Sequence, residues 1–203
     1  MSFPTWIRWA GLASMLAGLA WIVGSAGMLE VLPLLTQVGG HWVLGLAGLL
    51  TLLAIVGIFA RDAQRTAWWG IVGYALALIG ATVFAIGNVT EVGFGLEFGT
   101  VLFGLGLMSL IVGVVLLSVA TLRTKVLPSW SVWPLIIGLL VFLLVVNFAA
   151  AMVGPTAGST EKPVRWIVLA FMSAMLLGAG WMTVGYVLWS DKEGKGTHPE
   201  VEP

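Results

Sequence analysis

The chain has 203 residues, of which 60% are hydrophobic and 9% charged, and its formal net charge is zero. It contains no cysteine, which excludes disulfides, thiolate catalysis, iron–sulfur ligation and zinc–thiolate sites. Its basic residues form no block, so nothing indicates a nucleic-acid partner. This composition is typical of a protein embedded in a lipid bilayer, and we expect no bound cofactor.

Six apolar stretches are long enough to cross a bilayer, because a helix rising about 1.5 Å per residue needs about 20 residues for a hydrocarbon core about 30 Å thick. In chain order, the sequence predicts helices over 6–28, 41–59, 67–87, 98–122, 133–153 and 164–189. Within hydrocarbon each backbone N–H and C=O must find a partner inside its own segment, which leaves helices as the only option here. The predicted fold class is all-α: a polytopic membrane protein with six transmembrane helices in a glycine-rich bundle.

The predicted domain organisation is simple. Residues 1–189 form one transmembrane domain, and residues 190–203 form a polar tail with almost nothing apolar to bury, which predicts disorder. Basic residues in short loops favour the cytoplasm. On one side of the predicted bundle lie Arg8, Arg61, Arg65, Arg123, Lys125, Lys192 and Lys195, and on the other only Lys162 and Arg165. We therefore expect both termini in the cytoplasm and the protein in the bacterial cytoplasmic membrane, which it crosses several times.

Small residues recur at seven-residue steps in the third and fourth predicted helices. That period holds one helix face against a neighbour in a left-handed crossing. The predicted helix-packing glycines are Gly73, Gly80, Gly87, Gly99, Gly106 and Gly113. They suit contacts within the fold or, alternatively, contacts with a membrane-protein partner or a second copy of the chain.

Polar residues gather on the side of the membrane away from the termini. Ionisable groups at membrane depth are costly and commonly serve ion or proton handling. The candidate ion or proton site consists of Asn88, Glu91, Glu97 and Asn147. The alternative is that both glutamates are solvated at the turn between two helices and only block further insertion, while Asn147 makes an interhelical hydrogen bond.

His41 begins the second predicted helix. Histidine can sense pH near neutrality, but that role needs a carboxylate partner. Glu30 is the nearest candidate along the chain, so His41 and Glu30 form a candidate pH-sensitive pair. The simpler alternative places His41 at the interface as an ordinary first residue of a helix.

Catalytic and metal motifs are missing from the sequence. With two histidines, His41 and His198, the chain cannot supply bis-histidine haem ligation inside the bundle, and it has no HExxH, P-loop or GxSxG motif. We therefore expect neither an enzyme nor a metal site. Trp21 and Trp181 fall near the middle of their helices, where they serve either core packing or the wall of a ligand site.

Three functional hypotheses follow. The leading one is a non-enzymatic structural or accessory subunit that packs against partners in the bacterial cytoplasmic membrane, because the loops are short and intramembrane charges few. The second is a small transporter or channel for a proton, a cation or a small polar solute, with an outward-facing carboxylate site. The third is a protein that binds a lipid, quinone or pigment between its helices, with Trp21 and Trp181 as the wall.

Overall fold

The computed structural model describes residues 3–32, 34–62, 67–125, 127–152 and 164–190, and the side chains of residues 3, 4, 62, 146–152 and 164–166 fall outside this description. Its helices are α1 (Phe3–Met28), α2 (Gln37–Asp62), α3 (Trp68–Phe94), α4 (Phe98–Thr124), α5 (Ser129–Met152) and α6 (Val164–Ser190). No strand occurs in these ranges. The prediction of an all-α fold with six helices is therefore confirmed for the described part of the chain. The predicted disordered tail at 190–203 lies outside the described residues, apart from Ser190.

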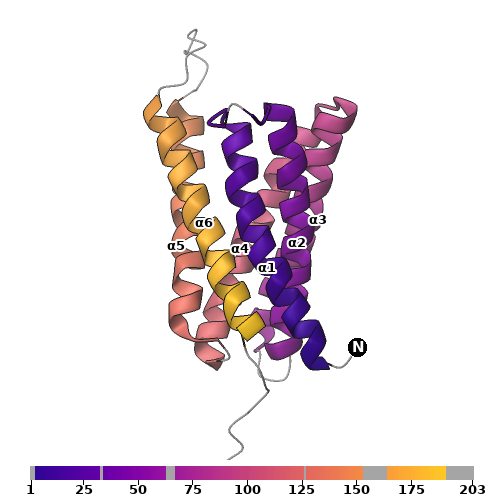
Figure 1. Cartoon of the computed structure of the whole chain (residues 1–203), viewed down its shortest axis with the longest axis vertical. Coiled ribbons are helices and arrows are strands. Elements are labelled where there is room, and N and C mark those ends of the chain that lie inside the picture. Colours follow the sequence, from indigo (N-terminus) through magenta and orange to yellow (C-terminus); the bar gives the residue numbers. More distant parts are fainter. Residues whose placement is uncertain (1–2, 33, 63–66, 126, 153–163, 191–203) are drawn as a thin grey trace, which may run out of the picture.

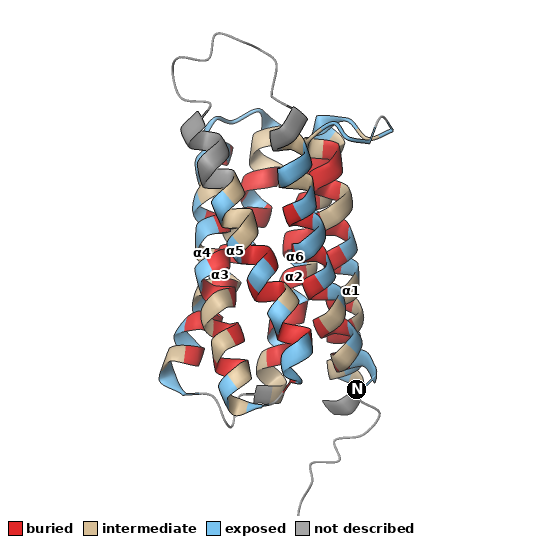
Figure 2. Cartoon of the chain, turned by 90° about the vertical axis from the view of Figure 1, so that its left-hand side faces the viewer, coloured by how far each residue is buried: buried red, intermediate tan, exposed pale blue. Residues whose placement is uncertain are grey.

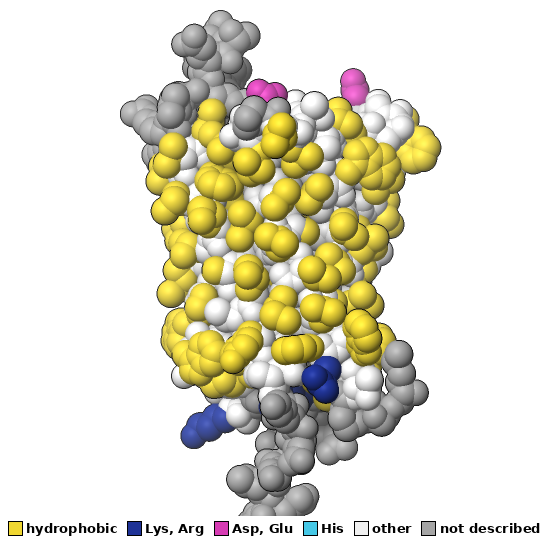
Figure 3. Space-filling view, in the orientation of Figure 1, with side chains coloured by type: hydrophobic (Ala, Val, Ile, Leu, Met, Phe, Trp, Pro, Cys, Tyr) yellow, Lys and Arg dark blue, Asp and Glu magenta, His cyan; other side chains and the backbone are white. Residues whose placement is uncertain are grey.

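Five helices, namely α1, α2, α3, α4 and α6, are long and apolar enough to cross a membrane. The corresponding apolar stretch described in α5 is shorter, Ser129–Val145. Apolar side chains cover the visible flank of the bundle, while acidic side chains lie at one end and basic ones at the other (Figure 3). An apolar surface this extensive suits lipid rather than water. The helices thus indicate a multi-pass membrane protein.

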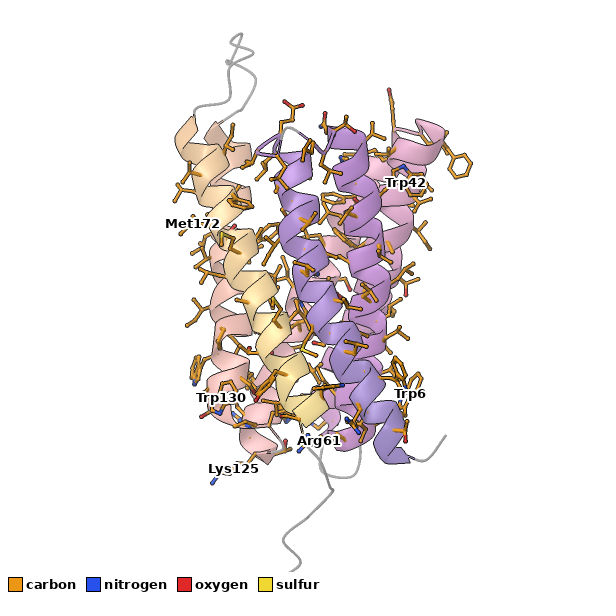
Figure 4. The ribbon with its side chains drawn as sticks, viewed as in Figure 1. Trp6, Trp42, Arg61, Lys125, Trp130 and Met172 are labelled. Atoms are coloured by element: carbon orange, nitrogen blue, oxygen red, sulfur yellow. The ribbon has the colours of Figure 1, made fainter. Side chains whose placement is uncertain are left out.

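The six helices form a ring in which each packs against the next along the chain and α6 packs against α1 (Figure 1). Buried residues turn toward the middle of this ring (Figure 2). The contact between α4 and α5 is the smallest of the ring. α1 begins and α6 ends at the end of the bundle that carries Arg61 and Lys125, whereas Trp42 lies at the opposite end (Figure 4). We call these the Arg61 end and the His41 end.

The third helix continues to Phe94 instead of ending at the predicted Gly87. The side-chain amide of Asn88 donates to the carbonyl oxygen one turn earlier at 2.9 Å, and the Thr90 hydroxyl does the same at 3.0 Å. Polar side chains of this kind do not end a helix when they bond within it. Gly95 ends α3, with a φ of 62° and its N–H bonded to the carbonyl of Thr90.

The fifth helix begins at Ser129 rather than at the predicted Trp133. Ser131 donates both its backbone N–H (3.0 Å) and its hydroxyl (2.8 Å) to the carbonyl oxygen of Pro128. These two bonds start the helix one turn earlier, so Pro134 lies inside it rather than at its beginning.

The α3–α4 seam is the contact formed by Gly73, Gly80, Gly87, Gly99, Gly106 and Gly113. A Cβ atom added at any of them would lie 2.2 to 2.8 Å from a backbone nitrogen of the opposite helix. The two helices therefore touch main chain to main chain, an approach that only small residues permit.

Candidate functional site

A cavity of about 150 Å³ lies inside the bundle, in the half nearer the His41 end. Every helix contributes to its lining. Among the lining residues are Trp21 and Ser25 of α1, Leu44 of α2, Phe84 of α3, Phe103 of α4, Phe142 of α5 and Ala170 of α6. Apolar cavities of about 150 Å³ in proteins stay dry and accept a molecule the size of benzene. This central cavity therefore has room for one small ring.

Four aromatic side chains form a continuous wall of the central cavity. The indole of Trp21 stacks on Phe84 with ring centroids 4.9 Å apart, and Phe84 lies 5.1 Å from Phe103. Phe142 meets Trp21 edge to face at 6.5 Å. All three separations fall in the range where aromatic pairs attract one another beyond simple burial. We call Trp21, Phe84, Phe103 and Phe142 the aromatic wall.

The α3–α4 seam positions two members of this wall. The backbone of Phe84 lies opposite Gly106, and that of Phe103 lies opposite Gly87. A Cβ at Gly106 would come within 2.2 Å of the Phe84 nitrogen, and one at Gly87 within 2.3 Å of the Phe103 nitrogen. The two glycines thus let the helices close until the rings of Phe84 and Phe103 meet across the contact.

Two contacts fix the side chain of Trp21, the stacking on Phe84 and a hydrogen bond to α2. It is only 2% exposed, and its Nε1 donates to the hydroxyl oxygen of Thr51 on α2 at 3.2 Å. Its indole N–H therefore has a partner outside the cavity. Of the two mid-helix tryptophans considered in the sequence, Trp21 lines the central cavity, whereas Trp181 lies beside a much smaller void.

That second void occupies about 10 Å³ in the half nearer the Arg61 end. Its lining includes Ser118, Thr121 and Trp181. A single water molecule needs about 10–15 Å³ of such volume. This void holds one water molecule at most, whereas the central cavity has room for a small ring.

His41 does not pair with Glu30, contrary to the prediction. Its Nδ1 lies 3.1 Å from Oδ1 of Asn88, whose Nδ2 donates to the carbonyl of Phe84. Because that amide donates through nitrogen, its oxygen accepts, and Nδ1 of His41 carries the proton. The second helix begins at Gln37, so His41 lies one turn inside it. Glu30 is an exposed loop residue with a φ of 57°.

The His41–Asn88 pair is deeply buried, with 5% of His41 and 1% of Asn88 exposed. The imidazole ring meets Phe103 edge to face at 6.2 Å, and neither His41 nor Asn88 lines the central cavity. The sequence placed Asn88 in a candidate ion site, and His41 either in a pH-sensitive pair with Glu30 or at the membrane interface. The structure joins them in one interhelical contact between α2 and α3.

The two glutamates of the predicted ion site lie near the turn between α3 and α4. Glu97 is exposed and immediately precedes α4, and Glu91 is partly exposed near the end of α3. Neither lines the central cavity. Asn147 has its side chain outside the described residues. Within the described ranges, no three His, Asp or Glu side chains come close enough together to hold a metal ion.

Sequence reasoning missed most of the cavity. No sequence pattern indicated that the rings of Phe84, Phe103 and Phe142 face the interior rather than lipid. Trp21 was singled out because an indole N–H at mid-depth needs a partner. Comparison with known proteins adds no further assignment: no protein-family model matches the chain, and no match is found among curated proteins or solved structures.

Proposed function

We propose that this multi-pass membrane protein binds a small, mostly apolar molecule in the central cavity. The observation that carries the proposal is the cavity itself: about 150 Å³, lined by all six helices and walled by four aromatic rings. Of the three hypotheses drawn from the sequence, the binding of a ligand between helices is the one that this geometry supports best. A binding role also fits the apolar lining, whose described residues offer no acid, base or nucleophile pair.

Shape rather than hydrophobicity would select the ligand. A molecule that leaves the bilayer for an apolar cavity gains little from the hydrophobic effect, because lipid tails are as apolar as the lining. It gains instead the van der Waals contacts that the atoms around an empty space lack. The aromatic wall, whose rings are fixed by the seam and by Thr51, provides a surface of defined shape for such contacts.

The transporter hypothesis receives less support. A conduction path would need polar or water-filled space through the half nearer the Arg61 end, where the void lined by Ser118 and Thr121 holds about 10 Å³. Glu91 and Glu97 lie at the His41 end without lining the central cavity. The carboxylates are better explained as the polar turn that joins α3 to α4.

The accessory-subunit hypothesis stays a prediction about partners. One experiment, native mass spectrometry, tests both this hypothesis and the binding proposal. We would record native mass spectra of the protein drawn from its own membrane in mild detergent. A binding protein should carry a bound small molecule of constant mass. A fixed stoichiometry with other subunits and no small molecule would favour the accessory role instead.

A matched pair of variants makes this experiment decisive. Ala170 lines the central cavity on α6, and Ala179 is exposed on the same helix. Ala170→Leu should fill the cavity and abolish the bound mass, whereas Ala179→Leu should retain it. If both variants keep the adduct, the molecule sits elsewhere and the proposal is wrong.

We also infer that the Arg61 end faces the cytoplasm. Arg61 and Lys125 lie at that end, whereas Glu30 and Glu97 belong to loops of the opposite end. Since the chain contains no cysteine, single cysteines report orientation directly. In intact cells, a membrane-impermeant maleimide should label Glu97→Cys and leave Lys125→Cys unlabelled; the reverse pattern would invert the topology.

A further inference from the structure

We propose that the ligand of the central cavity is a planar six-membered ring carrying a hydroxyl or carbonyl oxygen, and that this oxygen bonds to the hydroxyl of Ser25. This inference rests on the proposed binding function and specifies its ligand class. It depends on two features of the lining, an unpartnered hydroxyl and the arrangement of the aromatic rings.

Ser25 is the unpartnered group. It lies in α1, lines the central cavity and is only 7% exposed, yet its hydroxyl forms no hydrogen bond with any described residue. Helical serines normally bond back to a carbonyl of the preceding turn. Ser173 does so at 2.7 Å, and Ser14 donates across the bundle to the carbonyl of Trp181 at 2.7 Å.

Part of the Ser25 hydroxyl is accessible from the cavity. Facing an apolar lining instead of water is costly for such a group, because it loses its bonds to water and gains nothing in return. A ligand oxygen within the cavity would remove that cost. Ser118 is the useful comparison with Ser25, because it is also a buried serine whose hydroxyl bonds to no described residue. It faces the void of about 10 Å³, which has no space for a ligand.

The aromatic wall favours a flat ligand. Its four rings already pair with one another in stacked, tilted and edge-to-face arrangements at 4.9 to 6.5 Å. A planar ring in the remaining space can stack on these rings, whereas a saturated ring of the same size is puckered and fits such a stack poorly; an aromatic ring also gains the attraction of aromatic pairs. A volume of about 150 Å³ accepts one such ring and no second one.

Two sources can supply this chemistry. The ring is either the head of a lipid-borne quinol or quinone, whose tail would pass between helices into the bilayer, or a free phenol dissolved in the membrane. Solvent extraction of the purified protein, followed by mass spectrometry, separates them: a prenylated ring supports the first source and a free phenol the second. A bound compound with no ring would overturn the inference.

The direct test uses two fluorinated probes that differ by one oxygen, 4-fluorophenol and fluorobenzene. The full chain is placed in lipid nanodiscs, and saturable binding is measured by ¹⁹F NMR against empty nanodiscs. We expect 4-fluorophenol to bind about three- to tenfold more tightly, the range that one hydrogen bond supplies. Ser25→Ala should reduce its affinity to that of fluorobenzene.

Ser118→Ala is the matched control, because it removes an equally buried and equally unbonded hydroxyl outside the central cavity. It should keep the preference for the phenol. Neither substitution breaks a hydrogen bond within the described structure, so neither variant should unfold below the wild-type temperature.

The outcomes separate this inference from the function on which it rests. A phenol preference that Ser25→Ala abolishes and Ser118→Ala preserves supports both. Equal binding of the two probes, or a preference that survives Ser25→Ala, overturns the role of Ser25 and leaves the binding function standing. If neither probe binds saturably, the proposed function fails as well.

Discussion

The α3–α4 seam and the central cavity show opposite kinds of packing within one bundle. In the seam, no glycine can accept even one methyl group, since a Cβ there would lie 2.2 to 2.8 Å from the opposite backbone. A short distance away, a space of about 150 Å³ is left unfilled. Because α3 and α4 approach each other this closely, loose packing throughout the bundle does not explain the cavity. Bulky aromatic side chains and small residues such as Ser25 and Ala170 surround the cavity together.

The two regions share residues. Phe84 and Phe103 take part in the seam through their backbones, opposite Gly106 and Gly87, and in the cavity through their rings. Closing the seam therefore fixes where the rings lie. Interiors packed at high density transmit small displacements rather than absorb them, so a disturbed seam should also disturb the cavity.

The largest expected effect comes from Gly80→Ala in the seam. The added Cβ would lie 2.2 Å from the backbone nitrogen of Leu110, and only a separation of the helices can relieve that contact. Overpacking of this kind costs about 1–3 kcal/mol. We expect a clear fall in the unfolding temperature, measured in mild detergent.

Gly104→Ala is the control for this prediction. Gly104 lies in α4, one of the two helices of the seam, but a Cβ added there would meet nothing within 4 Å. Alanine there should stabilise α4 by about 0.5–1 kcal/mol through helix propensity alone. An unfolding temperature for Gly80→Ala equal to that of Gly104→Ala would mean that the seam yields freely, and the contrast with the cavity would disappear.

The next effect concerns the His41–Asn88 pair, which lies where the seam and the aromatic wall meet. Asn88→Ala leaves the buried Nδ1–H of His41 without its acceptor, a loss of about 1–3 kcal/mol. Chemical denaturation should show the lower stability, and ¹⁵N NMR of the imidazole should show a changed environment at Nδ1.

Thr82→Ala provides the comparison for Asn88→Ala on the same helix. Its exposed hydroxyl also bonds to the carbonyl one turn earlier, at 2.9 Å, but supports no second side chain. Its stability should stay within about 0.5 kcal/mol of the wild type. Equal losses in the two variants would show that the bond to His41 contributes nothing beyond a local helix contact.

The sequence allowed the helices to be predicted well, because apolar stretches long enough to cross a membrane can form little else. It also drew attention to the seven-residue glycine spacing in α3 and α4 and to Trp21. The partner of His41 could not be predicted, since Asn88 is 47 positions away and meets it only through the α2–α3 contact. Glu30 is nearer along the chain, but it is an exposed loop residue, and no sequence pattern predicted that its loop would keep it away from His41.

The cavity was unpredictable for a related reason. The void depends on the side chains of all six helices at one depth, so no pattern in the sequence of a single helix predicts it. The polar residues near Glu91 were given a functional interpretation because charge in an apolar sequence is conspicuous. The structure directs attention instead to Ser25, an inconspicuous residue in a run of small ones.

A smaller effect is expected for Thr51→Val, which keeps the shape of the side chain and removes the acceptor of the Trp21 indole N–H. Such interhelical bonds contribute about 0.6 kcal/mol on average in a membrane. The unfolding temperature should fall slightly, while binding of 4-fluorophenol should weaken more noticeably, because the indole loses its fixed position in the aromatic wall. Unchanged binding would show that stacking on Phe84 alone holds the ring.

The last prediction tests the comparison most directly, because its effect on stability has the opposite sign. Ala170→Leu adds three carbon atoms, against the single one of Gly80→Ala, yet it adds them to the central cavity. Filling an existing space typically changes stability by about 0.5–2 kcal/mol in the favourable direction. The unfolding temperature should therefore equal or exceed that of the wild type and of Ala179→Leu, even though ligand binding is lost. A destabilisation as large as that of Gly80→Ala would mean that the space near Ala170 is already occupied by packed side chains. The cavity would then be no more open than the seam, and both proposals built on it would fall.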